Sequence, residues 1–555
     1  MEALVCEKIF LESQNSANSE QPQRGVVVVD PPKIRQVIKV QSTSEFPKAI
    51  RELQSLYPEI TIRHLEDAYL LPGLIDINTK AKEGISETTH LALSGGVTSI
   101  FIETTESVTE EQLYCDLGKI KPVTNSLQVE SSEYFAFKAY QCTQSEGIIP
   151  IEDMQQTFER CKELNCPLIL DSLKAHSRFL HMASPFRTEE EELRSNSCEF
   201  YFLNSDYVAA VDRNQPELDS ISSSESEEEI NPEAIPCPAI TEESSEVSSS
   251  FDFVALSQVV LESYSGAGET FYNVSATNSG ISNSSTCANG LSRMNSLRPP
   301  RIDIGSNRND ETSYFSFLLN CPSSWELKGV NEALEVLERT NCKIHFANVS
   351  SVEAMNALQN VKSSLNLTFE TCPHYIFFNE KEIPSGDTRF KTFPPIRDTK
   401  NQMLIQKLLN ENSVDMINSH HKFVPENLKF LETGEFKRAM SGVNVLGFSL
   451  QAVWTQLYPN SKDPEKLLGK LVKLMSQNQA KFLGLQQKGG IAEGKDADLL
   501  IFKPFEVEDT QRSPTCIYNN TTLHGKVCEV YLRGRCAYSK EFLSPLGVEL
   551  CKSCL

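Results

Sequence analysis

The sequence carries little positive charge. Its 555 residues include 52 lysines and arginines against 75 aspartates and glutamates, which sets the formal net charge at −23 at pH 7. An acidic surface repels phosphate backbones, so we expect no nucleic-acid partner. Hydrophobic residues make up 39% of the chain, which is low enough to predict that part of it does not pack into a core.

Long apolar runs and closely spaced cysteines are also missing. No stretch reaches the roughly 20 apolar residues that a membrane-spanning helix needs. The opening MEALVCEKIFLESQ lacks the basic segment and long apolar run of a signal peptide. The 16 cysteines are scattered, unlike those of a disulfide-stapled secreted domain. We therefore expect a cytoplasmic protein with reduced thiols and no membrane partner.

Large apolar residues are sparse between residues 187 and 310. The stretches TEEEE, SSSESEEE, TEESSEVSSS and SATNSGISNSST are dominated by Ser, Glu, Asn and Gly. A segment of this composition buries too little apolar surface to offset its chain entropy. The pattern predicts an acidic, serine-rich disordered insertion over 187–310.

One apolar stretch interrupts this insertion. In FDFVALSQVVLESY at 251–264, Phe253, Leu256, Val260 and Tyr264 recur near helical spacing. The spacing indicates a segment that binds a protein partner or packs on the folded domain. A transient helix without a partner fits the pattern equally well.

Three serines of the insertion are candidate phosphorylation sites. Acidic residues follow Ser224 and Ser226 in SSSESEEE, and Ser296 lies three residues after Arg293, as at a basophilic kinase site. Each phosphate would add about −1.5 to −2 charge units to an already acidic chain. Short motifs of this kind also occur by chance, so unmodified spacer serines are the alternative.

The remainder of the chain alternates apolar strands with amphipathic helices. Strand candidates include LLPGLIDIN, VTSIFIET, YFAFKAY, CPLILDS, CKIHFANVS, NLTFETC and VDMINS, with helical stretches such as IEDMQQTFERCKEL between several of them. This alternation implies parallel strands with crossover helices, and at this length it favours a (β/α)8 barrel of the α/β class. We assign the barrel to 73–186 and 311–489, with its third strand at LQVE or nearby.

Both chain ends are rich in short strands. GVVVVD, KIRQVIKV and EITIRHL near the start, and DADLLIFKP and KVCEVYLRG near the end, are short apolar runs with many Val and Ile residues. We expect them to form one small composite β-sandwich from residues 1–72 and 490–540. Residues 541–555 are then a tail.

Several stretches together resemble the cyclic amidohydrolases of the allantoinase and dihydroorotase kind. LPGLIDIN with ALSGGVTSI is similar to the family's first strand and helix, and FAFKAY to the strand that presents its carbamylated lysine. The strongest match is FETCPHYIFFNEKEIPSGDTRFKTFPPIRDTKNQ, whose pairing of ETCPHY with PPIRD is typical of allantoinases. The resemblance implies the barrel, hydrolysis of C–N bonds in cyclic amides such as the allantoin of purine catabolism, and a homo-oligomer.

The resemblance also implies two divalent metal ions at the C-terminal ends of the barrel strands, a bridging hydroxide as nucleophile and an aspartate that shuttles the proton. Of the six ligand positions, only the carbamylated lysine is retained, as Lys138. The other five positions hold Asn78 and Lys80 at the HxH pair, Asp171 and Asn348 at two further histidines, and His420 at the aspartate.

These substitutions predict a catalytically impaired or inactive homologue with a regulatory or scaffolding role. Lys80 places a positive charge where two dications belong, and asparagine is a weak ligand for zinc. Without a metal, Lys138 has little reason to be carbamylated, and it then needs an anion, for which Asp171 is the expected partner. We expect no cofactor.

Two other functions remain open. One is a working cyclic amidohydrolase in which zinc or another divalent metal ion binds an atypical site made of Asn78, Lys138, Asp171 and His420. The other is a metal-free protein that binds a small ureide or cyclic amide. The loop FKTFPPIRD favours such a retained pocket, because the resemblance places it near the substrate through Phe393, Pro394 and Pro395.

Overall fold

The computed structural model describes residues 1–12, 20–81, 84–105, 112–130, 134–141, 148–174, 310–508, 513–519, 521–539 and 545–552. Apart from Asp310, the insertion expected over 187–310 lies outside these residues, together with its stretch 251–264 and the serines Ser224, Ser226 and Ser296. Within the described part of the chain, no helix is both long and apolar enough to cross a membrane.

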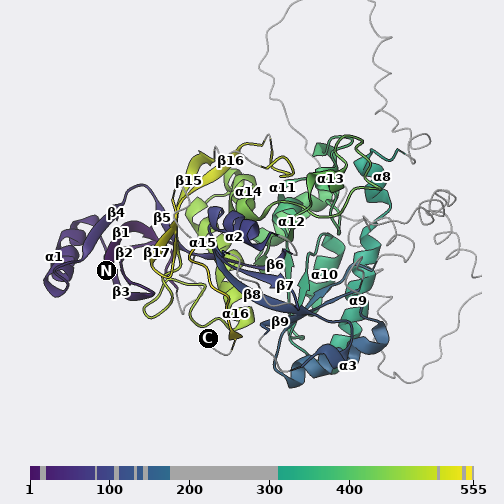
Figure 1. Ribbon diagram of the computed structural model, residues 1–555, viewed down its shortest axis with the longest axis horizontal. Helices are drawn as coiled ribbons and strands as arrows, with labels where there is room; N and C mark the ends of the chain where they lie inside the picture. Colours follow the sequence, from purple (N-terminus) through teal and green to yellow (C-terminus); the bar gives the residue numbers. More distant parts are fainter. Residues whose placement is uncertain are drawn as a thin grey trace, which may run out of the picture. The chain divides into compact units, whose positions relative to one another are not determined.

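Strands from both chain ends share one sheet (Figure 1). Its strands are β1 (Glu2–Ile9), β2 (Gln23–Asp30), β3 (Lys33–Lys39), β4 (Thr61–Leu65), β5 (Tyr69–Pro72), β15 (Leu499–Glu508), β16 (Leu523–Leu532) and β17 (Arg535–Tyr538). The order is β17-β16-β15-β5-β1-β2-β3, with β4 beside β1. Leu71 of β5 pairs antiparallel with Leu500 of β15, which joins the two ends and confirms the composite β-domain.

Helix α1 (Phe46–Leu56), preceded by the short 3-10 helix η1 (Thr43–Glu45), covers part of this sheet. Phe46, Ala49 and Leu53 are its buried residues, and they share an apolar cluster with Val26 and Val28 of β2. The spacing of three and four residues places these side chains on one helix face.

A second sheet consists of parallel strands in sequence order. They are β6 (Leu74–Lys80), β7 (Val97–Glu103), β8 (Asp116–Pro122), β9 (Ala136–Tyr140), β10 (Leu168–Asp171), β11 (Ile344–Ala347), β12 (Leu367–Thr371), β13 (Met416–Ile417) and β14 (His421–Lys422). β13 pairs with β12 at one edge, and β14 pairs with β6 at the other. Since only residues 418–420 separate β13 from β14, they act as one interrupted strand that closes the sheet into the expected barrel.

The longer helices of the barrel are α2 (Ile85–Ser94), α3 (Ile151–Glu163), α9 (Ser323–Thr340), α10 (Val352–Val361), α12 (Thr399–Asn410), α14 (Ser449–Leu457), α15 (Pro464–Val472) and α16 (Asn478–Leu483). Shorter elements are α8 (Tyr314–Leu319), α11 (Pro373–Phe377), α13 (Glu426–Lys429), η2 (Ser126–Gln128), η4 (Glu380–Glu382), η5 (Thr388–Phe390), η6 (Leu446–Phe448), η7 (Tyr458–Asn460) and the π-helix η8 (Lys473–Gln477). Helix α9 contacts both α3 and α10 (Figure 1). Its buried Val330, Ala333, Leu334 and Leu337 follow the 3.6-residue period.

The position expected for the third barrel strand is wrong. LQVE contributes to the 3-10 helix η2, and the strand is β8, which begins eleven residues before LQVE. Its sequence DLGKIKP reads as a polar loop because Asp116 and Lys119 interrupt the apolar pattern. Tertiary partners compensate for both charges: Asp116 lies 2.8 Å from Lys488 Nζ, and Lys119 lies 2.6 Å from Glu549.

Residues near the C-terminal end of the chain form backbone hydrogen bonds with β8. Leu117 donates its backbone N–H to Val548 at 3.0 Å and accepts from Leu550 at 2.7 Å. Residues 548–550, expected within a tail, therefore lie beside the barrel.

Strand alternation divides the barrel interior into two layers. Residues two apart on a strand point to the same face. On β7, β9 and β10 an apolar residue is followed, two positions later, by a charged one. The pairs are Phe101 and Glu103, Ala136 and Lys138, and Ile169 and Asp171. The apolar members share a cluster with Phe482 and Leu483 of α16. A polar layer thus lies above it, at the C-terminal ends of the strands.

Candidate functional site

The polar layer joins four of the six predicted ligand positions. Asn78 of β6 and Lys138 of β9 are hydrogen-bonded, with Lys138 Nζ 2.9 Å from Asn78 Oδ1. Asn78 also donates to Asn348, which follows β11. Asn348 Nδ2 in turn donates to Asp171 Oδ2 at 2.9 Å. The barrel therefore brings these residues together, as the resemblance predicts, and they bond to one another.

Lys138 pairs with a residue that the sequence does not single out. Its Nζ lies 2.6 Å from Oε1 of Glu103, the last residue of β7, and both side chains are buried. Lys80 Nζ lies 3.4 Å from the other carboxylate oxygen, which also accepts from the Tyr140 hydroxyl. Burial opposes a charge on Glu103, but Lys138 and Lys80 outweigh it and hold the pKa of this carboxyl well below its usual range.

The expected pairing of Lys138 with Asp171 is therefore replaced by the pair Lys138–Glu103. Asp171 keeps a different environment, in which burial raises its pKa to about 6 although Lys138 and Lys80 oppose the rise. Glu103 could have been predicted from the sequence, because it is the last residue of the apolar strand VTSIFIE. Asp171 is likewise the last residue of β10.

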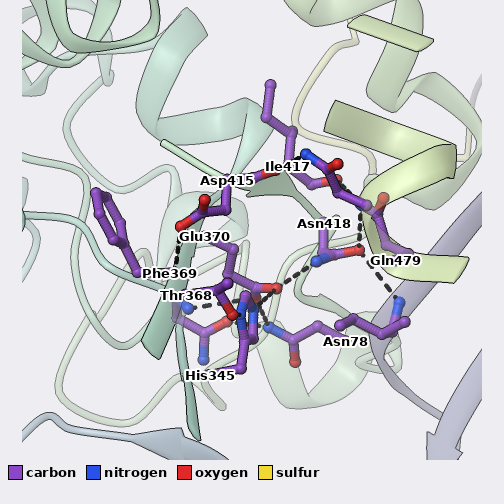
Figure 2. A network of polar contacts seen from close by, with 12 residues as sticks. Asn78, His345, Thr368, Phe369, Glu370, Asp415, Ile417, Asn418 and Gln479 are labelled. Atoms are coloured by element: carbon purple, nitrogen blue, oxygen red, sulfur yellow. Dashed lines mark hydrogen bonds and ion pairs between the residues drawn. The ribbon is translucent and has the colours of Figure 1, made fainter. Parts of the chain in front are cut away.

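Glu370 of β12 forms the centre of a second network (Figure 2). Its Oε2 lies 2.9 Å from His345 Nε2, and Asn78 and Asn418 donate their side-chain amides to its carboxylate. His345 Nδ1 contacts Thr368 Oγ1 at 2.8 Å. Burial opposes the charge on Glu370, yet His345 and the amide donors lower the pKa below its usual value. Sequence reasoning used ETCPHY as a family signature and missed this role of its glutamate.

Two further amides complete the network. Gln479 of α16 donates to Asn418 Oδ1 at 3.2 Å, and the backbone N–H of Ile77 donates to the same oxygen at 3.2 Å (Figure 2). Strands β6, β11 and β12, the β13–β14 link and α16 are thereby connected through one buried carboxylate.

Comparisons with known proteins agree with this fold and these motifs. Residues 460–538 match the amidohydrolase family. The chain is 32% identical over 262 residues to an allantoinase of Arabidopsis thaliana, covering 44% of this chain and 50% of that protein. It is 33% identical over 242 residues to an allantoinase of Streptomyces avermitilis, covering 42% and 53%. The chain thus spans about half the length of the curated relatives it matches.

Solved structures extend the likeness to the whole fold. A dihydropyrimidinase from Brevibacillus agri superposes with a TM-score of 0.64 at 16% identity, covering 99% of this chain and 98% of that one. An L-hydantoinase from Arthrobacter aurescens gives a TM-score of 0.64 at 14% identity, covering 99% of each. The chain is thus similar to allantoinases in sequence and shares the fold of a dihydropyrimidinase and an L-hydantoinase.

The metal centre implied by the family does not fit the residues that this allantoinase-like chain carries. Two divalent ions need anionic or imidazole donors. Four of the six matching positions instead offer the amides of Asn78 and Asn348, bonded to each other, and the ammonium groups of Lys80 and Lys138, both turned to Glu103. Only Asp171 and His420 offer a carboxylate and an imidazole. A carbamate on Lys138 would be negative and would face Glu103 where the ammonium now does.

His420 is not a member of the Lys138–Glu103 ion pair, although the charges of both residues act on its ring. It sits between β13 and β14 with a backbone φ of +50°, in the left-handed region. Its ligating nitrogen is grouped with Cys372 and His374, and the group does not include Asp171. Within the described ranges this is the one cluster of three or more His, Cys, Asp or Glu side chains placed to hold a metal ion.

The loop expected near a substrate packs against the same region. Pro394 and Pro395 are buried, and the Pro394 carbonyl accepts from the Tyr375 hydroxyl at 2.8 Å. The Phe393 ring lies 5.3 Å from the ring of Phe317. The loop is thus fixed to α11, the helix of the CPHY motif, and to α8.

Proposed function

We propose that this chain is an allantoinase homologue that has lost binuclear metal hydrolysis and serves a regulatory or scaffolding role. One observation carries the proposal: Lys138, the only residue that matches the family's ligands, is buried in an ion pair with Glu103 at 2.6 Å. Forming a carbamate requires a neutral amine and creates an anion. Two unit charges of the same sign about 4 Å apart repel by about 4 kcal/mol at an effective dielectric of 20.

A hydrolysis assay with the full chain tests the proposal. Allantoin, hydantoin, dihydrouracil and dihydroorotate are supplied with zinc, manganese or cobalt and bicarbonate, and ring opening is followed by chromatography. We expect no turnover above that of buffer, while an active allantoinase measured in parallel supplies the positive control. Turnover that disappears in a Lys138→Ala variant would show that the family mechanism operates and would overturn the proposal.

Ligand binding without hydrolysis is the second candidate. The buried loop around Pro394 favours it, because the Tyr375 hydroxyl fixes a segment that the resemblance places near the substrate. The ligand class would be a small ureide or cyclic amide. Calorimetric titration with allantoin and hydantoin tests this, and heat that saturates at one ligand per chain without ring opening would support it.

The remaining expectations stay predictions. The homo-oligomer, the cytoplasmic location and a partner for residues 251–264 rest on resemblance and sequence alone. A working hydrolase with an atypical metal site is the alternative that the assay above decides.

A further inference from the structure

Three ligating side chains meet where β12 and β13 end. Cys372 follows β12 directly and precedes α11, His374 lies in the first turn of α11, and His420 lies between β13 and β14. Their sulfur and ring-nitrogen atoms all lie within 4.8 Å of one another. Because β12 and β13 are paired neighbours, the barrel itself brings the CxH sequence and the distant histidine together.

The histidine nitrogens of this cluster have unmet bonding capacity. His374 is fully buried, and neither Nδ1 nor Nε2 has a hydrogen-bond partner. The buried Nδ1 of His420 has none either. Leaving a buried polar group unsatisfied is costly, and such groups in native proteins call for a specific explanation such as an ion. A metal ion would use these lone pairs.

The two histidines are in the neutral state that metal ligation needs, because burial lowers the pKa of both rings. Burial lowers the pKa of His374 to about 3, so its ring is neutral and can donate a lone pair. Burial, with the nearby Glu370, Asp76 and Asp171, raises the pKa of the Cys372 thiol. The same three carboxyl groups provide negative potential for a dication, although Lys138 opposes them. On binding, the Cys372 thiol would lose its proton to solvent as the metal–sulfur bond forms.

We propose that Cys372, His374 and His420 bind one divalent metal ion of the zinc class. Zinc accepts one thiolate and two imidazoles and holds them at about 2.3 and 2.0–2.1 Å, so the side chains would draw in slightly from their present spacing. The fourth position would lie on the side of His420, which is 9% exposed while Cys372 and His374 are fully buried. The site goes beyond the proposed function, because Cys372 and His374 are not among the family's ligand positions.

Metal analysis of the full chain tests the site. The protein is stripped with a chelator, dialysed, loaded with zinc and measured by elemental analysis, and a parallel sample is loaded with cobalt. We expect one zinc per chain and a near-ultraviolet thiolate-to-cobalt charge-transfer band. No bound metal, or cobalt binding without that band, would overturn the proposal. Two zinc ions per chain would point to the family's binuclear centre instead.

Variants locate the ligands. Cys372→Ser should remove the charge-transfer band and weaken zinc binding at least tenfold, and His374→Asn should weaken it by a similar factor. Cys321→Ser is the matched control, since Cys321 is equally buried and outside the cluster; it should keep both the band and the affinity. Equal affinity in Cys372→Ser and the control would contradict the site.

A measurement on the unmodified chain covers the case in which these variants do not fold. X-ray absorption of the zinc-loaded protein should give a shell of one sulfur and at least two imidazole nitrogens. A shell of oxygen and nitrogen alone would place the zinc elsewhere and overturn the proposal.

Discussion

The ammonium of Lys138 lies 2.6 Å from a carboxylate oxygen of Glu103, where a lysine carbamate would stand in the family. The two residues come from β9 and β7, with β8 between them in the barrel. Their contact turns the one retained ligand position into half of an ion pair, and the stability of the barrel mouth then depends on that pair.

Replacing Glu103 by Gln should destabilise the protein strongly. The change leaves Lys138 buried without its anion, and breaking a buried pair in this way costs about 3–5 kcal/mol. Urea unfolding followed by circular dichroism measures the loss. Glu130→Gln is the control, because Glu130 pairs with Lys121 at the surface and its loss should not move the midpoint. Equal losses of stability in the two variants would show that the buried pair contributes no more to folding than the surface pair.

Asp171 should contribute more to the stability of the protein at acid pH than at neutral pH. Its folded pKa, about 6, lies above the unfolded value near 3.8. The folded state therefore binds the extra proton, and the contribution of Asp171 is largest below about pH 4 and is lost as pH rises through 6. Asp171→Asn removes this loss while keeping an acceptor for Asn348.

The Asp171→Asn variant should be more stable than the parent chain by on the order of 2 kcal/mol at pH 7.5, from a shift of roughly two pKa units. The difference should vanish near pH 4. Urea titrations at a series of pH values measure both stabilities. A variant that is less stable than the parent at pH 7.5 would show that the Asp171 carboxylate is needed in its charged form.

Restoring the family's ligands should fail while Glu103 remains. A five-position variant carries Asn78→His, Lys80→His, Asp171→His, Asn348→His and His420→Asp. Glu103 would still hold Lys138 as an ammonium, so we expect little carbamate and less than two metal ions per chain. Adding Glu103→Ala should raise both. Elemental analysis measures the metal content, and intact mass spectrometry in bicarbonate measures the carbamate on Lys138. Two metal ions bound by the five-position variant, without Glu103→Ala, would show that Glu103 does not block the site.

The insertion over 187–310 should be dispensable for folding, because its composition offers no core. Replacing it by a short Gly/Ser bridge should leave the thermal midpoint nearly unchanged in calorimetry. A loss of several degrees would mean that the segment packs on the barrel.

Mass spectrometry of the native protein tests phosphorylation at Ser224, Ser226 and Ser296, and three unmodified serines under all growth conditions would exclude that hypothesis.

Much of the fold could be predicted from the sequence because it depends on local patterns. Apolar strands alternating with amphipathic helices predict a parallel barrel, and the Val- and Ile-rich chain ends predict the composite sheet. The prediction failed at β8, where Asp116 and Lys119 hide a strand. Partners far along the chain, Lys488 and Glu549, neutralise these charges, and local periodicity carries no information about them.

Most strands could be located from the sequence alone because their apolar runs are local, and the resemblance implied which residues stand at the family's ligand positions. The tertiary structure alone decided what those residues do. Closing the barrel places Glu103 beside Lys138 and brings His420 to Cys372 and His374. Electrostatic pairing and metal ligation act over a few ångströms, and only the folded barrel determines which side chains from different strands come that close.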